Sequence, residues 1–166
     1  ALYEKKLLTY PRTDSNYLTE DTAATVPELL EQSVSSLPFS VEVGPTDISR
    51  VIDASKVSDH HALLPTMQVK QDALAALPAG ERNILTLVIV RLLCAVSEKQ
   101  VYEDTAVELD CGGTSFAAKG RVVTSPGWKA VEQAFLSTLK QKPEKDDPEA
   151  AALPSITEGQ SLSGCK

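Results

Sequence analysis

Tyr10 and Arg12 stand two residues apart in the segment L-L-T-Y-P-R-T-D-S-N at 7–16, and side chains of these types can transfer a phosphoryl group. A tyrosine hydroxyl that attacks a phosphodiester builds negative charge on the non-bridging phosphate oxygens. An arginine stabilises such charge with a planar fork of hydrogen bonds that lysine does not offer. Pro11 disfavours helical geometry at Tyr10, so we predict that a preceding helix ends here with both side chains facing outward.

A second group that could take part in this chemistry is the D-H-H sequence at 59–61. A tyrosine hydroxyl is protonated at neutral pH, so it needs a proton acceptor or nearby positive charge during attack. Arg12 offers the charge, and histidine is the side chain that most readily changes protonation near neutrality. Asp14 and Asp59 are both candidates to orient the ring of His60. Structural alternatives exist for both groups: a tyrosine at a helix end with only its hydroxyl exposed, and a buried histidine bonded to backbone.

Adjacent histidines also raise the question of a metal site. Neighbouring residues of an extended segment point in opposite directions, so His60 and His61 would not converge on one ion. The three cysteines form no C-x-x-C pair, and such sparse use is typical of free thiols in a reducing compartment; they are Cys94, Cys111 and Cys165. We therefore predict that this chain alone binds no metal.

Several elements must position these residues. We predict helices over 2–8 and over 19–36, the second with Thr19 as its N-cap and with a restart at Pro27. Residues 39–47 are predicted to form a loop that leads to the D-H-H segment. The apolar run at 80–98 predicts a helix buried in the middle of the domain.

The second part of the sequence alternates in strand fashion. Residues 101–110 and 114–123 flank Gly112 and Gly113, which predicts a hairpin. A short helix over 128–136 should start at Trp128 and dock its aromatic residues on the sheet, and the charged residues 140–150 should form a solvated linker. The predicted fold class is α+β, with a helical domain over 1–99 and a β-rich segment over 100–166.

Composition limits the possible functions. The chain has 166 residues, 42% of them hydrophobic, and a net charge of −7. No apolar stretch of about 18 residues and no signal-peptide pattern occurs, so we predict a cytoplasmic, monomeric chain without a membrane contact. The acidic balance predicts weak DNA affinity for the chain by itself, because phosphate contacts normally come from excess lysine and arginine. Since the sequence opens within L-Y-E-K-K-L-L and stops at S-L-S-G-C-K, we expect a segment truncated from a longer protein.

Three separated motifs together carry a family resemblance: L-Y-E-K-K-L-L at 2–8, T-Y-P-R-T-D-S at 9–15 and D-H-H-A-L-L-P-T at 59–66. With a weaker continuation through S-P-G-W at 125–128, the sequence resembles the type IA DNA topoisomerases, specifically the topoisomerase III branch. The resemblance implies that a tyrosine cleaves single-stranded DNA through a transient 5′-phosphotyrosyl bond. Religation after strand passage relaxes or decatenates the DNA. It also implies a helix-turn-helix-like domain around the tyrosine, followed by a β-rich part of an arch domain.

Residue by residue, the resemblance makes Tyr10 the nucleophile and Arg12 the contact to the scissile phosphate. Thr13 and Asp14 match residues that support the site, and His60 matches a histidine near the DNA backbone. His61, next to it, falls where another branch has glutamate. Mg²⁺ is expected in the full-length enzyme, bound by a toprim-type domain outside this chain, and no nucleotide cofactor is expected. The expected partners are single-stranded DNA, in a nucleoid-associated setting, and the remaining domains of the same polypeptide.

Two departures from the family pattern bear on DNA contact. Asn16 stands where relatives often have a basic residue, and Leu64 where another branch has arginine, which predicts a weaker or differently placed DNA grip. The runner-up hypothesis is a non-catalytic helix-turn-helix DNA-binding or interaction module, although no helix obviously begins with exposed Arg, Asn or Gln. A third hypothesis, a relaxase-type tyrosine endonuclease, lacks its histidine-hydrophobe-histidine metal pair here.

Overall fold

The computed structural model describes residues 1–139 and 153–163, which fall into two compact units. The helical unit comprises Ala1–Lys99 and the segment that begins at Gly127. The hairpin unit comprises Gln100–Pro126 and the C-terminal stretch 153–163. The predicted charged linker at 140–150 and Cys165 lie outside the described residues. The result is a mixed α+β chain with five α-helices and one antiparallel hairpin in its described part.

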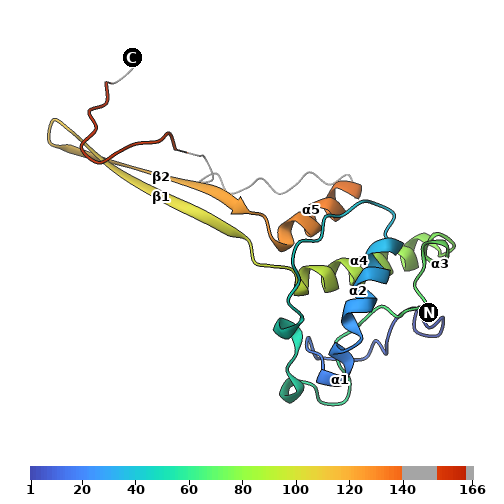
Figure 1. Cartoon of the computed structure of the whole chain (residues 1–166). Helices are drawn as coiled ribbons and strands as arrows, with labels where there is room; N and C mark the ends of the chain where they lie inside the picture. The colour runs from blue at the N-terminus through green and yellow to red at the C-terminus, as the bar shows by residue number, and fades with distance from the viewer. Residues whose placement is uncertain (140–152, 164–166) are drawn as a thin grey trace. The chain divides into compact units, whose positions relative to one another are not determined.

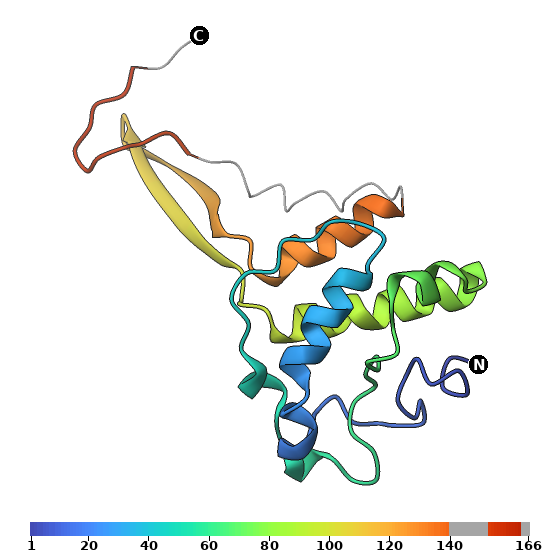
Figure 2. The same ribbon diagram turned by 45° about the vertical axis from the view of Figure 1, so that its right-hand side comes forward.

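The long helix α4 (Ala79–Val96) is the centre of the helical unit, and Figures 1 and 2 show it beside the shorter elements. It contacts α2 (Val26–Ser36), α3 (Gln71–Ala75), α5 (Trp128–Thr138) and the 3₁₀ turn η1 (Ile48–Val51). Its fully buried residues recur every three or four positions and face these neighbours: Leu85, Ile89, Leu93 and Val96. This spacing forms one apolar stripe of a helix, and it confirms the helix predicted over 80–98.

The predicted helix over 19–36 is divided into α1 (Glu20–Ala23) and α2. Thr19 occupies the N-cap position, but its hydroxyl contacts the Thr22 hydroxyl at 2.9 Å instead of a backbone N–H. Pro27 lies in the first turn of α2, where its missing N–H costs no intrahelical bond. The proline restart is therefore confirmed.

The predicted helix over 2–8 is wrong. Lys5 N–H donates to Ala1 O and Leu7 N–H donates to Leu2 O, which closes a single turn. Lys6 then adopts a φ of 57°, and this left-handed conformation ends the turn. So short a segment forms too few helical bonds to offset the cost of nucleation, whereas the turn and the extended residues after it bury Leu2, Leu7 and Leu8.

Helix α5 begins at Trp128 as predicted, but the expected docking of its aromatic residues on the sheet is wrong. Phe135 is buried in the helical core, with its ring centroid 6.2 Å from that of Phe39. Trp128 N–H donates to Glu98 O at 2.8 Å, which joins the start of α5 to the end of α4. The core of α4 offers α5 a larger apolar surface than a two-stranded ribbon does.

The hairpin pairs β1 (Val101–Cys111) with β2 (Thr114–Ser125) in antiparallel register, so the predicted hairpin is confirmed. Gly112 and Gly113 have φ values of 59° and 81°, the left-handed pair that a tight two-residue turn requires. One face is charged, with Asp104 paired to Arg121 across the strands.

Among the described residues, no helix is long and apolar enough to cross a membrane.

Candidate active site

Two segments far apart in sequence form the scaffold of the candidate site. Residues 7–9 run antiparallel to residues 64–66, and a bridge pairs Leu8 with Pro65. Thr9 N–H donates to Leu64 O at 2.9 Å, and Thr66 N–H donates to Leu7 O at 3.1 Å. The Thr9 hydroxyl also accepts from Leu64 N–H at 2.9 Å. This pairing brings the residues that follow Thr9 next to the residues that precede Leu64, which include both histidines.

Tyr10 lies directly beyond this pairing and is half-buried between two aromatic rings. Its ring centroid is 4.7 Å from that of His60, at an interplanar angle of 55°. On another side, Tyr3 packs edge-on at 5.2 Å. Tyr10 is thus partly exposed, as an outward-facing side chain would be, while both rings restrict where it can point.

An open depression on the surface collects most of the residues that the sequence singled out. It is lined by the tyrosine segment on one side and the histidine segment on the other: Tyr10, Pro11, Arg12, Thr13, Asp14, Ser58, Asp59 and His60. Arg12 is exposed, and within the described part of the chain it forms no ion pair or hydrogen bond. Its guanidinium is thus available to an anion that enters the depression. Asp14 and Asp59 supply the opposing negative charge.

Thr13 joins the two sides of the depression through its hydroxyl. The Thr13 Oγ1 donates to the backbone carbonyl of His60 at 2.9 Å and accepts from Ser15 N–H at 3.1 Å. His60 itself is exposed, so the alternative of a buried structural histidine is wrong. No hydrogen bond joins Asp14 or Asp59 to the His60 ring in the described residues, and both remain candidate orienters.

His61 points away from Tyr10. Its ring lines a separate depression with Thr9, Leu64 and Met67 among others, and its Nδ1 lies 2.7 Å from Ala62 O. The two adjacent histidines therefore diverge, as the extended backbone predicted. Within residues 1–139 and 153–163, no three His, Cys, Asp or Glu side chains are grouped closely enough to hold a metal ion.

Sequence reasoning assigned no role to four residues at or near the depression. Ser58 lines it, Tyr3 contacts Tyr10, and Ser15 and Lys56 are joined by a hydrogen bond behind it. Ser15 belongs to the T-D-S motif itself, so its position next to Asp14 was the available signal. Tyr3 reaches Tyr10, and Lys56 reaches Ser15, only in the folded chain.

Known proteins resemble this chain along its whole length. The family model described as DNA topoisomerase matches residues 1–166. The chain is 38% identical to DNA topoisomerase 3 of Bacillus licheniformis, with 98% of the chain and 22% of the relative covered. It is 35% identical to the proteins of the same name from Bacillus subtilis and Bacillus cereus, with 97% of the chain and 22% of each relative covered.

The chain belongs to the type IA DNA topoisomerase family. Its relatives in the topoisomerase III branch are much longer, since the chain spans about a fifth of their length. The resemblance stated from the three sequence motifs is confirmed.

Proposed function

We propose that this chain carries the nucleophile of a topoisomerase III reaction. The Tyr10 oxygen forms a bond to the phosphorus of a single-stranded DNA phosphodiester, and the P–O3′ bond breaks. The products are a 5′-phosphotyrosyl link and a free 3′ hydroxyl. After strand passage, the 3′ hydroxyl attacks the same phosphorus and restores Tyr10, so that DNA is relaxed or decatenated without net hydrolysis. The observation that carries this proposal is the contact of Tyr10 with His60 in a depression that also presents Arg12.

The proposed roles follow from where each side chain lies. Arg12, exposed and without an ion pair in the described chain, stabilises charge on the non-bridging phosphate oxygens. His60 contacts the reacting tyrosine or the DNA backbone next to it, and Thr13 holds the His60 backbone in place. Asp14 and Asp59 adjust the charge of the depression. His61 faces the neighbouring depression and would contact DNA beyond the cleavage point.

The remaining steps require protein outside this chain. Type IA topoisomerases generally use Mg²⁺, which would screen phosphate charge during cleavage and religation. We propose that a toprim-type domain of the full-length enzyme binds it, that no nucleotide is needed, and that the fragment alone is inactive. In that enzyme, the helical unit corresponds to the helix-turn-helix-like gate domain and the hairpin to part of the arch. The setting would be cytoplasmic, on nucleoid DNA.

Trapping of the covalent intermediate tests the nucleophile. The full-length enzyme that contains these residues is incubated with end-labelled single-stranded DNA and Mg²⁺, then denatured, and the protein–DNA adduct is quantified. We expect Tyr10→Phe to abolish the 5′ adduct. Tyr3→Phe is the matched control, because it removes a hydroxyl from the ring that packs against Tyr10 and should leave the adduct in place.

An adduct that persists in Tyr10→Phe, or one that disappears only in Tyr3→Phe, would contradict the assignment. Absence of any wild-type adduct, under conditions where the DNA is bound, would favour a non-catalytic interaction module. Arg12→Lys keeps the charge but loses the planar fork, and we expect it to slow adduct formation by roughly 10²-fold.

A further inference from the structure

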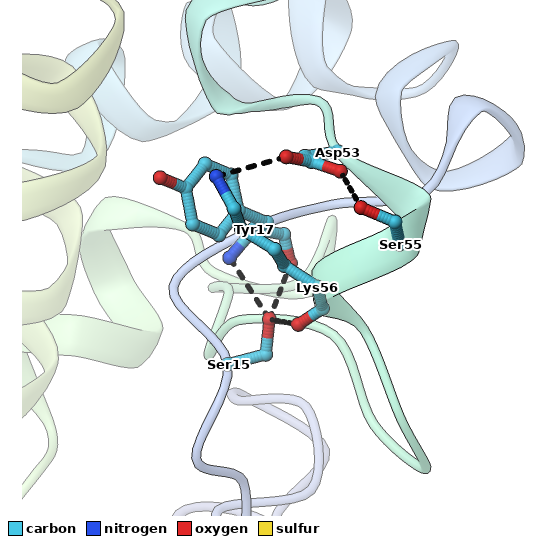
Figure 3. A network of polar contacts seen from close by, with 5 residues as sticks. All are labelled: Ser15, Tyr17, Asp53, Ser55 and Lys56. Atoms are coloured by element: carbon cyan, nitrogen blue, oxygen red, sulfur yellow. Dashed lines mark hydrogen bonds and ion pairs between the residues drawn. The ribbon is translucent and has the colours of Figure 1, made fainter.

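A second set of polar contacts ties the tyrosine segment to the histidine segment behind the depression (Figure 3). The Ser15 hydroxyl donates to the backbone carbonyl of Lys56 at 2.9 Å, across 41 positions of sequence. The same oxygen accepts from Tyr17 N–H at 3.0 Å. A hydroxyl has one proton to donate, and the Tyr17 carbonyl is farther away, at 3.4 Å. Ser15 is therefore committed to Lys56 as a donor and to Tyr17 as an acceptor.

Lys56 is held by its side chain as well as by its backbone. Its ammonium lies 2.9 Å from an Asp53 carboxylate oxygen and 4.3 Å from the centroid of the Tyr17 ring. Asp53 in turn accepts from the Ser55 hydroxyl at 2.5 Å. Asp53 and Tyr17 both raise the pKa of Lys56, chiefly through hydrogen bonds. The short 3₁₀ turn η2 (Ala54–Lys56) is thus fixed against the residues that follow the tyrosine motif.

A third contact holds the chain on the C-terminal side of His60. Ala62 N–H donates to Tyr17 O at 2.9 Å. The five residues 57–61, which contain Asp59 and His60, therefore run between two anchored points: Lys56, whose carbonyl is bonded to Ser15, and Ala62, which is bonded to Tyr17. A chain this short cannot shift far while both ends are held, so the position of His60 depends on the position of the tyrosine segment.

We propose that Ser15 is a positioning residue that, through Lys56 and Tyr17, fixes His60 against the nucleophile Tyr10. The proposal rests on the function proposed above for Tyr10. Ser15 is not among the residues that line the depression, and the described contacts of its hydroxyl are to backbone atoms of Tyr17 and Lys56 rather than to the Tyr10 ring. Loss of its hydroxyl would leave Tyr17 N–H and Lys56 C=O without their partner and would loosen one anchor of the 57–61 segment. Small displacements of reacting groups are costly, so DNA cleavage should slow while DNA binding is kept.

The test uses the full-length enzyme in single-turnover cleavage of saturating labelled single-stranded DNA, with DNA affinity measured separately. We expect Ser15→Ala to slow adduct formation about 10-fold and to change the dissociation constant less than about twofold. Ser15→Thr keeps a hydroxyl and should restore most of the rate. Ser35→Ala is the matched control, since within the described part of the chain the Ser35 hydroxyl bonds only the Gln32 carbonyl of its own helix. Equal rates for Ser15→Ala and Ser35→Ala, or a loss confined to DNA affinity, would overturn the proposal.

Two further measurements keep the proposal testable if Ser15 variants fold poorly. Asp53→Asn weakens the Lys56 anchor without removing positive charge, and we expect about a threefold slower cleavage at unchanged or higher DNA affinity. Faster cleavage in Asp53→Asn would mean that Lys56 is a phosphate contact and would overturn the positioning role. Nuclear Overhauser contacts between the Tyr10 and His60 rings should weaken in Ser15→Ala. This readout is independent of chemistry, so it still tests positioning if Tyr10→Phe shows that Tyr10 is not the nucleophile.

Discussion

The helical unit and the hairpin unit bury their apolar residues to very different extents. In the helical unit, Leu85, Ile89 and Leu93 are completely buried, and the core extends from Leu2 to Phe135. In the hairpin, buried positions are nearly absent from the described strands, and large apolar residues are exposed; they are Val101, Tyr102, Phe116, Val122 and Val123. The helical unit is thus stabilised by packing, whereas the hairpin relies on its turn and on cross-strand pairs.

This difference explains why the candidate site lies where it does. Its two segments are separated by about fifty positions in the sequence. Hydrogen bonds such as that from Leu64 N–H to the Thr9 hydroxyl join them, and the burial of Leu7, Leu8 and Leu64 keeps these segments in place. A rigid core lets exposed groups such as Arg12 keep a fixed place at the surface. The hairpin offers ordered strands but no comparable support for a set of reacting side chains.

The largest expected effect comes from truncating one apolar side chain in each unit and comparing the losses in the free energy of unfolding. Leu93→Ala removes a fully buried side chain of α4, and we expect a loss of about 2–5 kcal/mol in the free energy of unfolding. Phe116→Ala removes a larger side chain that is 55% exposed, and we expect a change of about 0.5 kcal/mol or less. Urea unfolding followed by the fluorescence of Trp128, the sole tryptophan, measures the helical unit directly. Comparable losses in both variants would contradict the contrast between the units.

A second prediction uses two glycines that both have a positive φ. Gly127 has a φ of 50°, and a Cβ there would lie 2.5 Å from the carbonyl carbon and oxygen of Lys99. Gly112 has a φ of 59°, but a Cβ there would meet no atom within 4 Å. We expect Gly127→Ala to cost about 3 kcal/mol, because strain and a backbone clash add, and Gly112→Ala only about 1 kcal/mol. Thermal unfolding of both variants measures the two losses of stability. A larger loss for Gly112→Ala than for Gly127→Ala would contradict the prediction.

Much of the fold could be predicted from the sequence where the signal is local. The apolar run at 80–98 and the alternation around Gly112 and Gly113 specify a helix and a hairpin almost without help from the rest of the chain. The N-terminal segment 2–8 has the same apolar spacing as a helix, but it is short, and tertiary burial of its leucines decides its conformation. Helix α3 was missed because its five residues are too few to show a period.

The candidate site shows a similar limit. Tyr10 and Arg12 could be proposed from residue chemistry alone, and adjacent histidines in an extended segment were expected to diverge. The contact of Tyr10 with His60 depends on the pairing of segments 7–9 and 64–66, and nothing in local sequence specifies that pairing. For the same reason, Ser15 could not be connected with Lys56, since the hydrogen bond between them exists only in the folded chain.

A third prediction compares one thiol from each unit. Cys94 lies on α4, and burial, with a smaller effect of Glu132, raises its pKa from 9.0 to about 11. Because only the thiolate reacts, a shift of that size should make Cys94 about 100-fold slower toward iodoacetamide at pH 8 than an ordinary thiol. Cys111 is exposed at the end of β1 and should be alkylated first. Timed alkylation with peptide mass spectrometry measures both, and unfolding in urea should equalise them. Equal rates in the folded protein would mean that α4 opens more readily than its burial implies.

The smallest expected effect concerns one exposed ion pair in each unit. Hydrogen bonds from Ser55 and then Lys56 lower the pKa of Asp53, and a hydrogen bond from Arg121 lowers that of Asp104, in both cases from an ordinary value of 3.8. A lowered carboxyl pKa adds stability that is fully present above the unfolded value and is lost as pH falls through the folded value. Between neutral pH and about 5, neither pair should therefore alter stability with pH.

Because the pKa of each carboxyl is lowered, both should remain ionised below the ordinary value of 3.8. Carboxyl carbon chemical shifts followed by NMR from pH 6 to pH 2 would measure the titration of each one. In Ser55→Ala, the Asp53 titration should move back toward 3.8 while that of Asp104 stays in place, because Ser55 contacts only the first carboxylate. Since both pairs are solvent-exposed, the accompanying change in stability should be small and should shrink with added salt. A coincident shift of both carboxylates in Ser55→Ala would show that the two units do not respond separately.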